Sequence, residues 1–124
     1  MTQKAFKIAG WTLTIILAAM FIMSALLKLT RNEAAIAQAS AFGIDPTTFQ
    51  FIGIIEVISL ILFIIPKTGI IGTLALAAYL GGAIVTHLEH QQSIAMAVTF
   101  QMAVWITAFI RFPELKQRIF TTRK

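Results

Sequence analysis

Long runs of apolar residues constrain this chain more than any other feature of its sequence. Four such runs cover about residues 8–27, 48–65, 68–86 and 93–110. Each is close to the roughly 20 residues that a helix needs to cross a bilayer core about 30 Å thick. With 58% hydrophobic residues among 124, the chain has more apolar surface than a soluble domain of this size can bury. The sequence therefore predicts an all-α, polytopic membrane protein, a single domain over residues 1–124 built as a bundle of four transmembrane helices.

Basic residues are divided unequally between the two sides of this predicted bundle. With four spans, both termini and the turn after the second run share one side. That side carries most of the lysines and arginines, namely Lys4, Lys7, Lys67, Arg111, Lys116, Arg118, Arg123 and Lys124, and the other side has only Lys28 and Arg31. Short loops rich in Lys and Arg stay in the cytoplasm, so we expect a bacterial inner-membrane protein with both termini cytoplasmic. This rule accounts for the net charge of +5, so the expected partner is the lipid bilayer and no nucleic acid is expected.

The segment between the first two runs, TRNEAAIAQASAFGIDP, predicts a short helix at the membrane interface. Apolar side chains recur there at a three-residue spacing from Ile36 to Phe42. Gly43 is expected to end this helix. Asp45 is then placed to cap the next helix, with Pro46 at its first position.

Small residues follow one face of the third run. Gly69, Thr73, Ala77 and Gly81 recur at every fourth position. Small residues on one face let a helix approach its neighbours closely, so the pattern favours close packing over a binding role.

Glu56 interrupts the second run, in the stretch GIIEVISLILFIIP. Counted at about 1.5 Å per residue from the ends of the runs, Glu56, Tyr79 and Gln101 fall in one layer near the middle of the bilayer. A charge there costs about 2.5–3.5 kcal/mol on the mildest scale, so Glu56 should face the bundle interior. We expect hydrogen bonds from Tyr79 and Gln101 to satisfy it. The carboxyl group of Glu56 then marks a proton, ion or ligand site. The alternative is that Glu56 is protonated and only holds helices together.

Two further candidates lie nearer the outer surface, where Lys28 ends the first run and His87 ends the third. Together they are expected to form the mouth of a cavity above the Glu56 layer. The alternatives are a lysine that extends to the headgroups and a histidine that marks the water boundary. His87 and His90 offer two metal ligands, too few for a closed site, so no metal site is predicted. The sequence contains no cysteine, catalytic triad, phosphate loop or dinucleotide fingerprint, so no catalytic residue is predicted either.

In its order and spacing, this pattern resembles the DoxX-like family of small four-helix membrane proteins. The likeness rests on FIMSALLKL, FGIDPTTFQFIGIIEVISLILFIIPKTGIIG and LGGAIVTHLEH. The residues at positions expected for that family are Lys28, Glu56, Pro66, Gly72, Gly82, Ala83 and His87. The family takes its name from a small subunit of thiosulfate:quinone oxidoreductase, and other relatives are linked to redox partners or to the assembly of membrane proteins. The resemblance thus implies a four-helix bundle and a redox-associated subunit.

The leading hypothesis is a protein that binds a quinone or another small amphipathic ligand between Glu56, Tyr79, Gln101, Lys28 and His87. This hypothesis favours an accessory subunit over a complete enzyme. The subunit would have a membrane or redox partner, and it could also form a homo-oligomer. One alternative is a proton-coupled transporter of the small multidrug resistance type, in which substrate and protons compete for an embedded carboxylate. Against it, the glutamate lies in the second run and the basic bias fixes a single orientation. The other alternative is a non-catalytic assembly factor.

Overall fold

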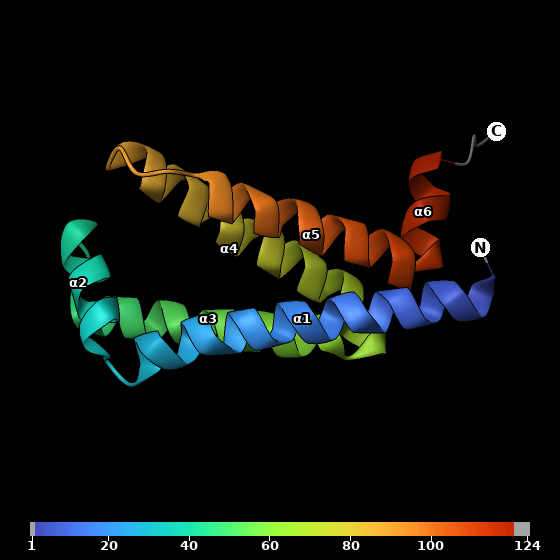
Figure 1. Ribbon diagram of the computed structural model, residues 1–124, viewed down its shortest axis with the longest axis horizontal. Helices are drawn as coiled ribbons and strands as arrows, with labels where there is room; N and C mark the ends of the chain where they lie inside the picture. The colour runs from blue at the N-terminus through green and yellow to red at the C-terminus, as the bar shows by residue number, and fades with distance from the viewer. Residues whose placement is uncertain (1, 121–124) are drawn as a thin grey trace.

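The computed structural model describes residues 2–120, and these are helical apart from short connections (Figure 1). The elements are α1 (Gln3–Leu29), α2 (Glu33–Ala41), α3 (Pro46–Ile64), the 3-10 helix η1 (Pro66–Thr68), α4 (Gly69–Glu89), α5 (Ala95–Arg111) and α6 (Pro113–Phe120). The four apolar runs correspond to α1, α3, α4 and α5, with ends that differ by a few residues from the predicted ones. Arg123 and Lys124, counted above among the basic residues, lie outside the described residues.

Three helical segments are long and apolar enough to cross a membrane: α1, α3 and the continuous stretch Pro66–Glu89. The segment α5 qualifies only together with α6, and this pair bends by 99°. Large apolar side chains on the long helices are exposed, among them Ile15, Ile58, Leu74 and Met102. A bilayer covers such surfaces. The chain is therefore a multi-pass membrane protein, with three or four candidate spans among residues 2–120.

The four long helices pack side by side, with α1 and α4 each contacting both α3 and α5. Their shared core is apolar and contains Leu17, Phe63, Leu76, Val104 and Ala108. Figure 1 shows the two termini at one end of the molecule and α2 at the other, and the pair α4 and α5 diverges from α1 toward α2. The bundle is therefore narrow near the termini and wide near α2.

Two glycines hold the narrow end closed. A Cβ atom at Gly72 would overlap the backbone of Phe63, so only glycine lets α4 touch α3 at this point. A Cβ atom at Gly69 would overlap the ring of Phe112 in the same way. By contrast, a Cβ atom at Gly81 would meet nothing within 4 Å. The predicted face of small residues thus packs closely at its beginning, and the prediction is wrong for Gly81, which lies nine residues from Gly72 and so on the opposite face of α4 from this contact.

The predicted turn between the short helix and α3 is confirmed. Gly43 follows the end of α2 with a φ of 67°, in the left-handed region that favours glycine. Asp45 caps α3 by accepting hydrogen bonds from the N–H groups of Thr47 and Thr48 at 3.0 and 3.4 Å. Pro46 is the first residue of the helix.

The helix ends near α2 share one geometry. Residues with positive φ follow α1, α2 and α4, namely Arg31 (53°), Gly43 (67°) and Gln91 (58°). The N–H of the next residue then donates to the third-last carbonyl of each helix, in the pairs Asn32 to Leu27, Ile44 to Ala39 and Gln92 to His87. These are Schellman motifs, which satisfy carbonyl groups that a helix end leaves without a partner.

Candidate functional site

Lys28 of α1 and Glu56 of α3 form an ion pair inside the bundle. Lys28 Nζ lies 3.1 Å from Glu56 Oε1, and the two side chains are 9% and 1% exposed. Ser24 Oγ accepts a hydrogen bond from Nζ at 2.6 Å and donates to Oε1 at 3.4 Å. A buried charge is tolerated when an opposite charge and hydrogen bonds compensate it. The three side chains therefore form one interdependent group.

Small residues make room for this group. Ser24 and Lys28 are four residues apart and so lie on one face of α1. Across from them, a Cβ atom at Gly53 of α3 would lie only 2.9 Å from the Cβ of Lys28. The ammonium group also lies 5.4 Å from the ring centroid of Phe49 and 5.9 Å from that of Tyr79. At such distances the face of an aromatic ring attracts a cation. Gly53 thus lets the lysine enter an aromatic site.

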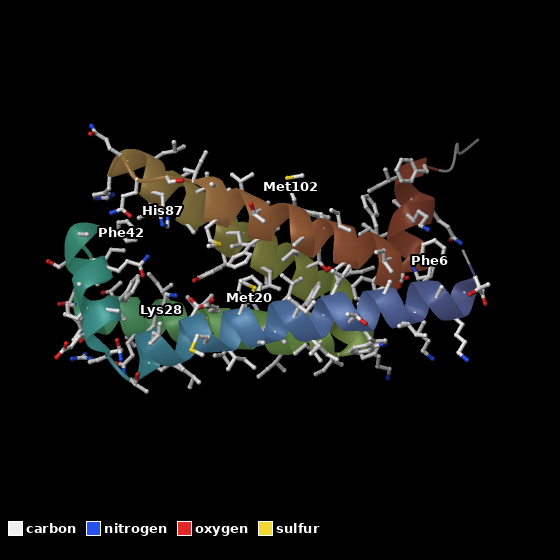
Figure 2. The ribbon with its side chains drawn as sticks, viewed as in Figure 1. Phe6, Met20, Lys28, Phe42, His87 and Met102 are labelled. Carbon is white, nitrogen blue, oxygen red and sulfur yellow. The ribbon has the colours of Figure 1, made fainter. Side chains whose placement is uncertain are left out.

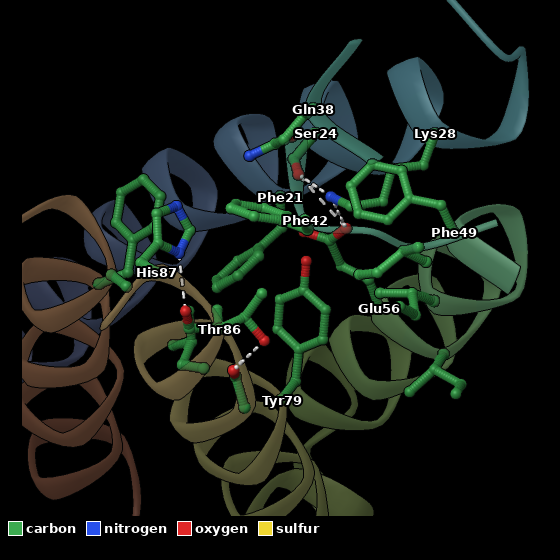
Figure 3. Close-up of a pocket in the computed structure, with 18 of the residues that line it drawn as sticks. Phe21, Ser24, Lys28, Gln38, Phe42, Phe49, Glu56, Tyr79, Thr86 and His87 are labelled. Atoms are coloured by element: carbon green, nitrogen blue, oxygen red, sulfur yellow. Dashed lines mark hydrogen bonds and ion pairs between the residues drawn. The ribbon is translucent and has the colours of Figure 1, made fainter. Parts of the chain in front are cut away.

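The ion pair borders a cavity of about 450 Å³ with walls from α1 to α5. This volume is within the range of roughly 300–1,000 Å³ that is usual for small-molecule sites. Most of the lining is apolar or aromatic, and its polar side chains are Ser24, Lys28, Gln38, Glu56, Tyr79, Thr86 and His87. Figure 3 shows the hydroxyl group of Tyr79 pointing toward the carboxylate of Glu56. The cavity thus combines a few convergent polar groups with aromatic walls.

Phe42, just after α2, lines the end of the cavity near α2, and Figure 2 shows it close to His87. Its ring centroid lies 5.0 Å from that of His87 and 5.4 Å from that of His90. Nδ1 of His87 is 2.7 Å from the carbonyl oxygen of Ala83. A carbonyl only accepts, so Nδ1 carries the hydrogen and a neutral His87 keeps Nε2 as an acceptor. Within residues 2–120, no histidine or carboxylate cluster of three or more forms a metal site here.

Four of the five predicted site residues line the cavity, and Gln101 does not. Gln101 Nε2 donates to the carbonyl oxygen of Ala77 at 3.0 Å, and Oε1 accepts from the indole N–H of Trp105 at 3.1 Å. The predicted hydrogen bond from Gln101 to Glu56 is therefore wrong. Equal depth in the membrane fixes a position along the helix axis, but it does not fix the direction of a side chain around that axis.

The structure also corrects the position of Lys28, which was predicted at the cavity mouth. Helical side chains lean toward the helix N-terminus. For a lysine near the C-terminus of α1, that direction leads back into the bundle, where it meets Glu56. The spacing of Ser24 and Lys28 places both on one face of α1, but it does not show that Gly53 of α3 lies opposite. The sequence does not indicate Gln38, because the spacing of apolar residues in α2 predicts only a helix on the membrane surface, whereas in the structure Gln38 lines the cavity.

Comparison with known proteins identifies the family. Residues 12–109 match the model of the DoxX-like family, so the chain belongs to that family. No curated protein and no solved structure matches the chain. All residues that line the cavity lie inside the matched region, from Phe21 to Phe100.

Proposed function

We propose that this member of the DoxX-like family binds a small amphipathic ligand with a flat polar head, of quinone type, beside Lys28 and Glu56. The observation that carries the proposal is a buried ion pair on the wall of a cavity of about 450 Å³. Ionisable groups inside a membrane are costly and usually belong to functional sites. Apolar pockets with a few convergent polar groups are the usual form of ligand sites.

The lining favours a ring that carries hydrogen-bond acceptors. The ammonium group of Lys28 has three N–H donors, and Ser24 and Glu56 engage two of them among the described residues. The hydroxyl group of Tyr79 lies on the same side and points toward the carboxylate of Glu56. Aromatic side chains such as Phe49 give a flat ring surfaces on which to pack. A bound quinone would supply two-electron, two-proton chemistry, for which the ammonium group of Lys28 and the hydroxyl group of Tyr79 hold protons and the carboxylate of Glu56 can take one up.

The same proposal makes the protein a redox-associated accessory subunit. The polar residues of the cavity form hydrogen bonds and exchange protons, so electrons for a quinone head have to come from a partner protein.

The transporter and assembly hypotheses predict different outcomes for the same carboxylate. A transporter uses it to couple export to protons, whereas an assembly factor uses it only to hold helices together.

We further propose that α5 is a fourth span, that α2 lies on the outer surface of a bacterial inner membrane, and that both termini are cytoplasmic. Basic residues gather at the end of the molecule that holds the N-terminus, η1 and α6, namely Lys4, Lys7, Lys67, Arg111, Lys116 and Arg118 (Figure 1). This is the distribution expected of a cytoplasmic side. In α6, exposed Ile119 and Phe120 accompany the basic side chains, as in helices that lie on a membrane surface.

Native mass spectrometry of mildly extracted protein tests the proposed function. We expect the wild type to retain a species with the mass of a membrane quinone, and Glu56→Gln to lose it. Glu89→Gln removes a carboxylate that lies outside the cavity lining and serves as the control. An empty wild type whose Glu56→Gln variant loses proton-coupled export from vesicles would instead indicate a transporter. A retained partner chain, with no small molecule and no effect of Glu56→Gln, would indicate an assembly factor.

A further inference from the structure

The cavity wall formed by α3 and α4 includes residues that are exposed on the outside of the bundle. At Gly72 a Cβ atom would overlap the backbone of Phe63. Gly82, about 15 Å farther along α4, is exposed, and a Cβ atom there would meet nothing within 4 Å. Gly82 lines the cavity, as do Ile52 and Ile55 of α3. Because Ile55 is 54% exposed, this wall continues into the surface that faces lipid.

Aromatic rings obstruct other sides of the cavity. Phe42 lines the end near α2, where it packs against His87. Toward α5, the rings of Phe21 and Phe100 are in contact, with centroids 5.7 Å apart. Leu80 of the core lies among the lining residues and is buried. For a head group beside the ion pair, the side between α3 and α4, where Ile55 and Gly82 are both exposed, offers an apolar route to the bilayer.

We infer that the crevice between α3 and α4 is a lateral portal, through which an acyl or prenyl tail runs from the cavity into the bilayer. The inference rests on the proposed function, because it places the tail of the ligand whose head lies at Lys28 and Glu56. The portal walls are apolar, with Ile52 and Ile55 on one helix and Ala78 and Gly82 on the other. A tail in this position keeps its contact with hydrocarbon. The ligand is thus a tailed, membrane-dissolved amphipath that enters from the lipid and does not pass through water.

Adjacent glycines on α4 provide a matched pair of variants. Gly82→Leu and Gly81→Leu add the same side chain at positions where a Cβ atom meets nothing within 4 Å. Of the two glycines, only Gly82 lines the cavity. The probes are dimethoxy-methyl-benzoquinone and its decyl derivative, with affinities measured in lipid nanodiscs. We expect Gly82→Leu to weaken binding of the decyl probe by about tenfold and to leave the tail-less probe unchanged. Gly81→Leu should change neither affinity.

Other results would contradict the portal, and they would show whether the proposed function fails with it. If Gly82→Leu leaves the decyl probe unchanged, or weakens both probes equally, the portal is wrong and the proposed function still holds. If the wild type binds neither probe, the proposed function fails and the portal fails with it. Thermal unfolding in the same nanodiscs checks that the variants fold. Ala78→Leu, one turn away on the same wall, is a second portal variant and should act as Gly82→Leu does.

Discussion

The two cations that enter the bundle, Lys28 at its wide end and Arg111 at its narrow end, have different surroundings. Arg111 donates hydrogen bonds to the carbonyl oxygens of Phe63 and Ile64, both at 2.9 Å. Its guanidinium group also lies 4.5 Å from the ring of Trp11 and 4.7 Å from that of Phe112. Within residues 2–120, no carboxylate pairs with it. Lys28, in contrast, is paired with Glu56 and borders a cavity.

This difference separates a cation that serves packing from one to which the proposed function assigns a role in binding. Phe63 and Ile64 are among the last residues of α3, whose carbonyl groups lack partners within the helix. The flat guanidinium group of Arg111 satisfies both carbonyls and stacks on aromatic rings, so it fills its site. An ammonium group paired with a carboxylate beside open space keeps the capacity to bind something else. The family match includes Lys28 and Glu56 and ends before Arg111.

The largest expected effect comes from breaking the pair at the wide end. Lys28→Met leaves the carboxylate of Glu56 buried without a counter-charge. Removal of one partner of a buried pair costs about 3–5 kcal/mol, so the unfolding free energy in nanodiscs or mixed micelles should fall by about that amount. Adding Glu56→Gln to Lys28→Met should recover part of the loss, because the buried charge is then removed. If the double variant loses as much unfolding free energy as the Lys28→Met and Glu56→Gln single variants together, the two side chains are not coupled.

A smaller effect should separate the two ends of α4 through its glycines. Gly72→Ala forces α3 and α4 apart, because the new methyl group overlaps the backbone of Phe63, and we expect a loss of about 1–3 kcal/mol. Gly82→Ala meets open space and improves helix propensity, which is worth up to about 1 kcal/mol. Chemical unfolding of the two variants measures the contrast. Equal losses would show that the wide end is packed as tightly as the narrow one.

The smallest effect concerns the turns of the wide end. Arg31 and Gln91 are non-glycine residues with positive φ. The left-handed conformation costs such residues roughly 1–2 kcal/mol, part of which is offset by the freedom that glycine adds to the unfolded chain. We therefore expect Gln91→Gly to raise the unfolding temperature slightly. Gly43→Ala is the reverse substitution at a position with the same conformation, and it should lower the unfolding temperature.

The sequence predicted the features of this fold that depend on neighbouring residues. The apolar lengths of α1 and α3 and the cap at Asp45 are local properties, and the structure has them. The direction of Gln101 and the pairing of Lys28 depend on how the helices rotate about their axes. That rotation follows from packing at Gly53 and Gly72, whose effect on distant side chains no sequence spacing expresses.

Equilibrium binding of decyl-benzoquinone in nanodiscs tests the contrast between the two ends most directly. Glu56→Gln removes the charge that holds Lys28 at the cavity wall, and loss of one partner of a buried charge pair should weaken binding by at least about tenfold. Arg111→Lys should leave the affinity unchanged while it lowers the unfolding temperature, because lysine cannot reach both carbonyl groups with one planar fork. Equal affinities for Glu56→Gln and the wild type, or a loss caused by Arg111→Lys alone, would contradict the account.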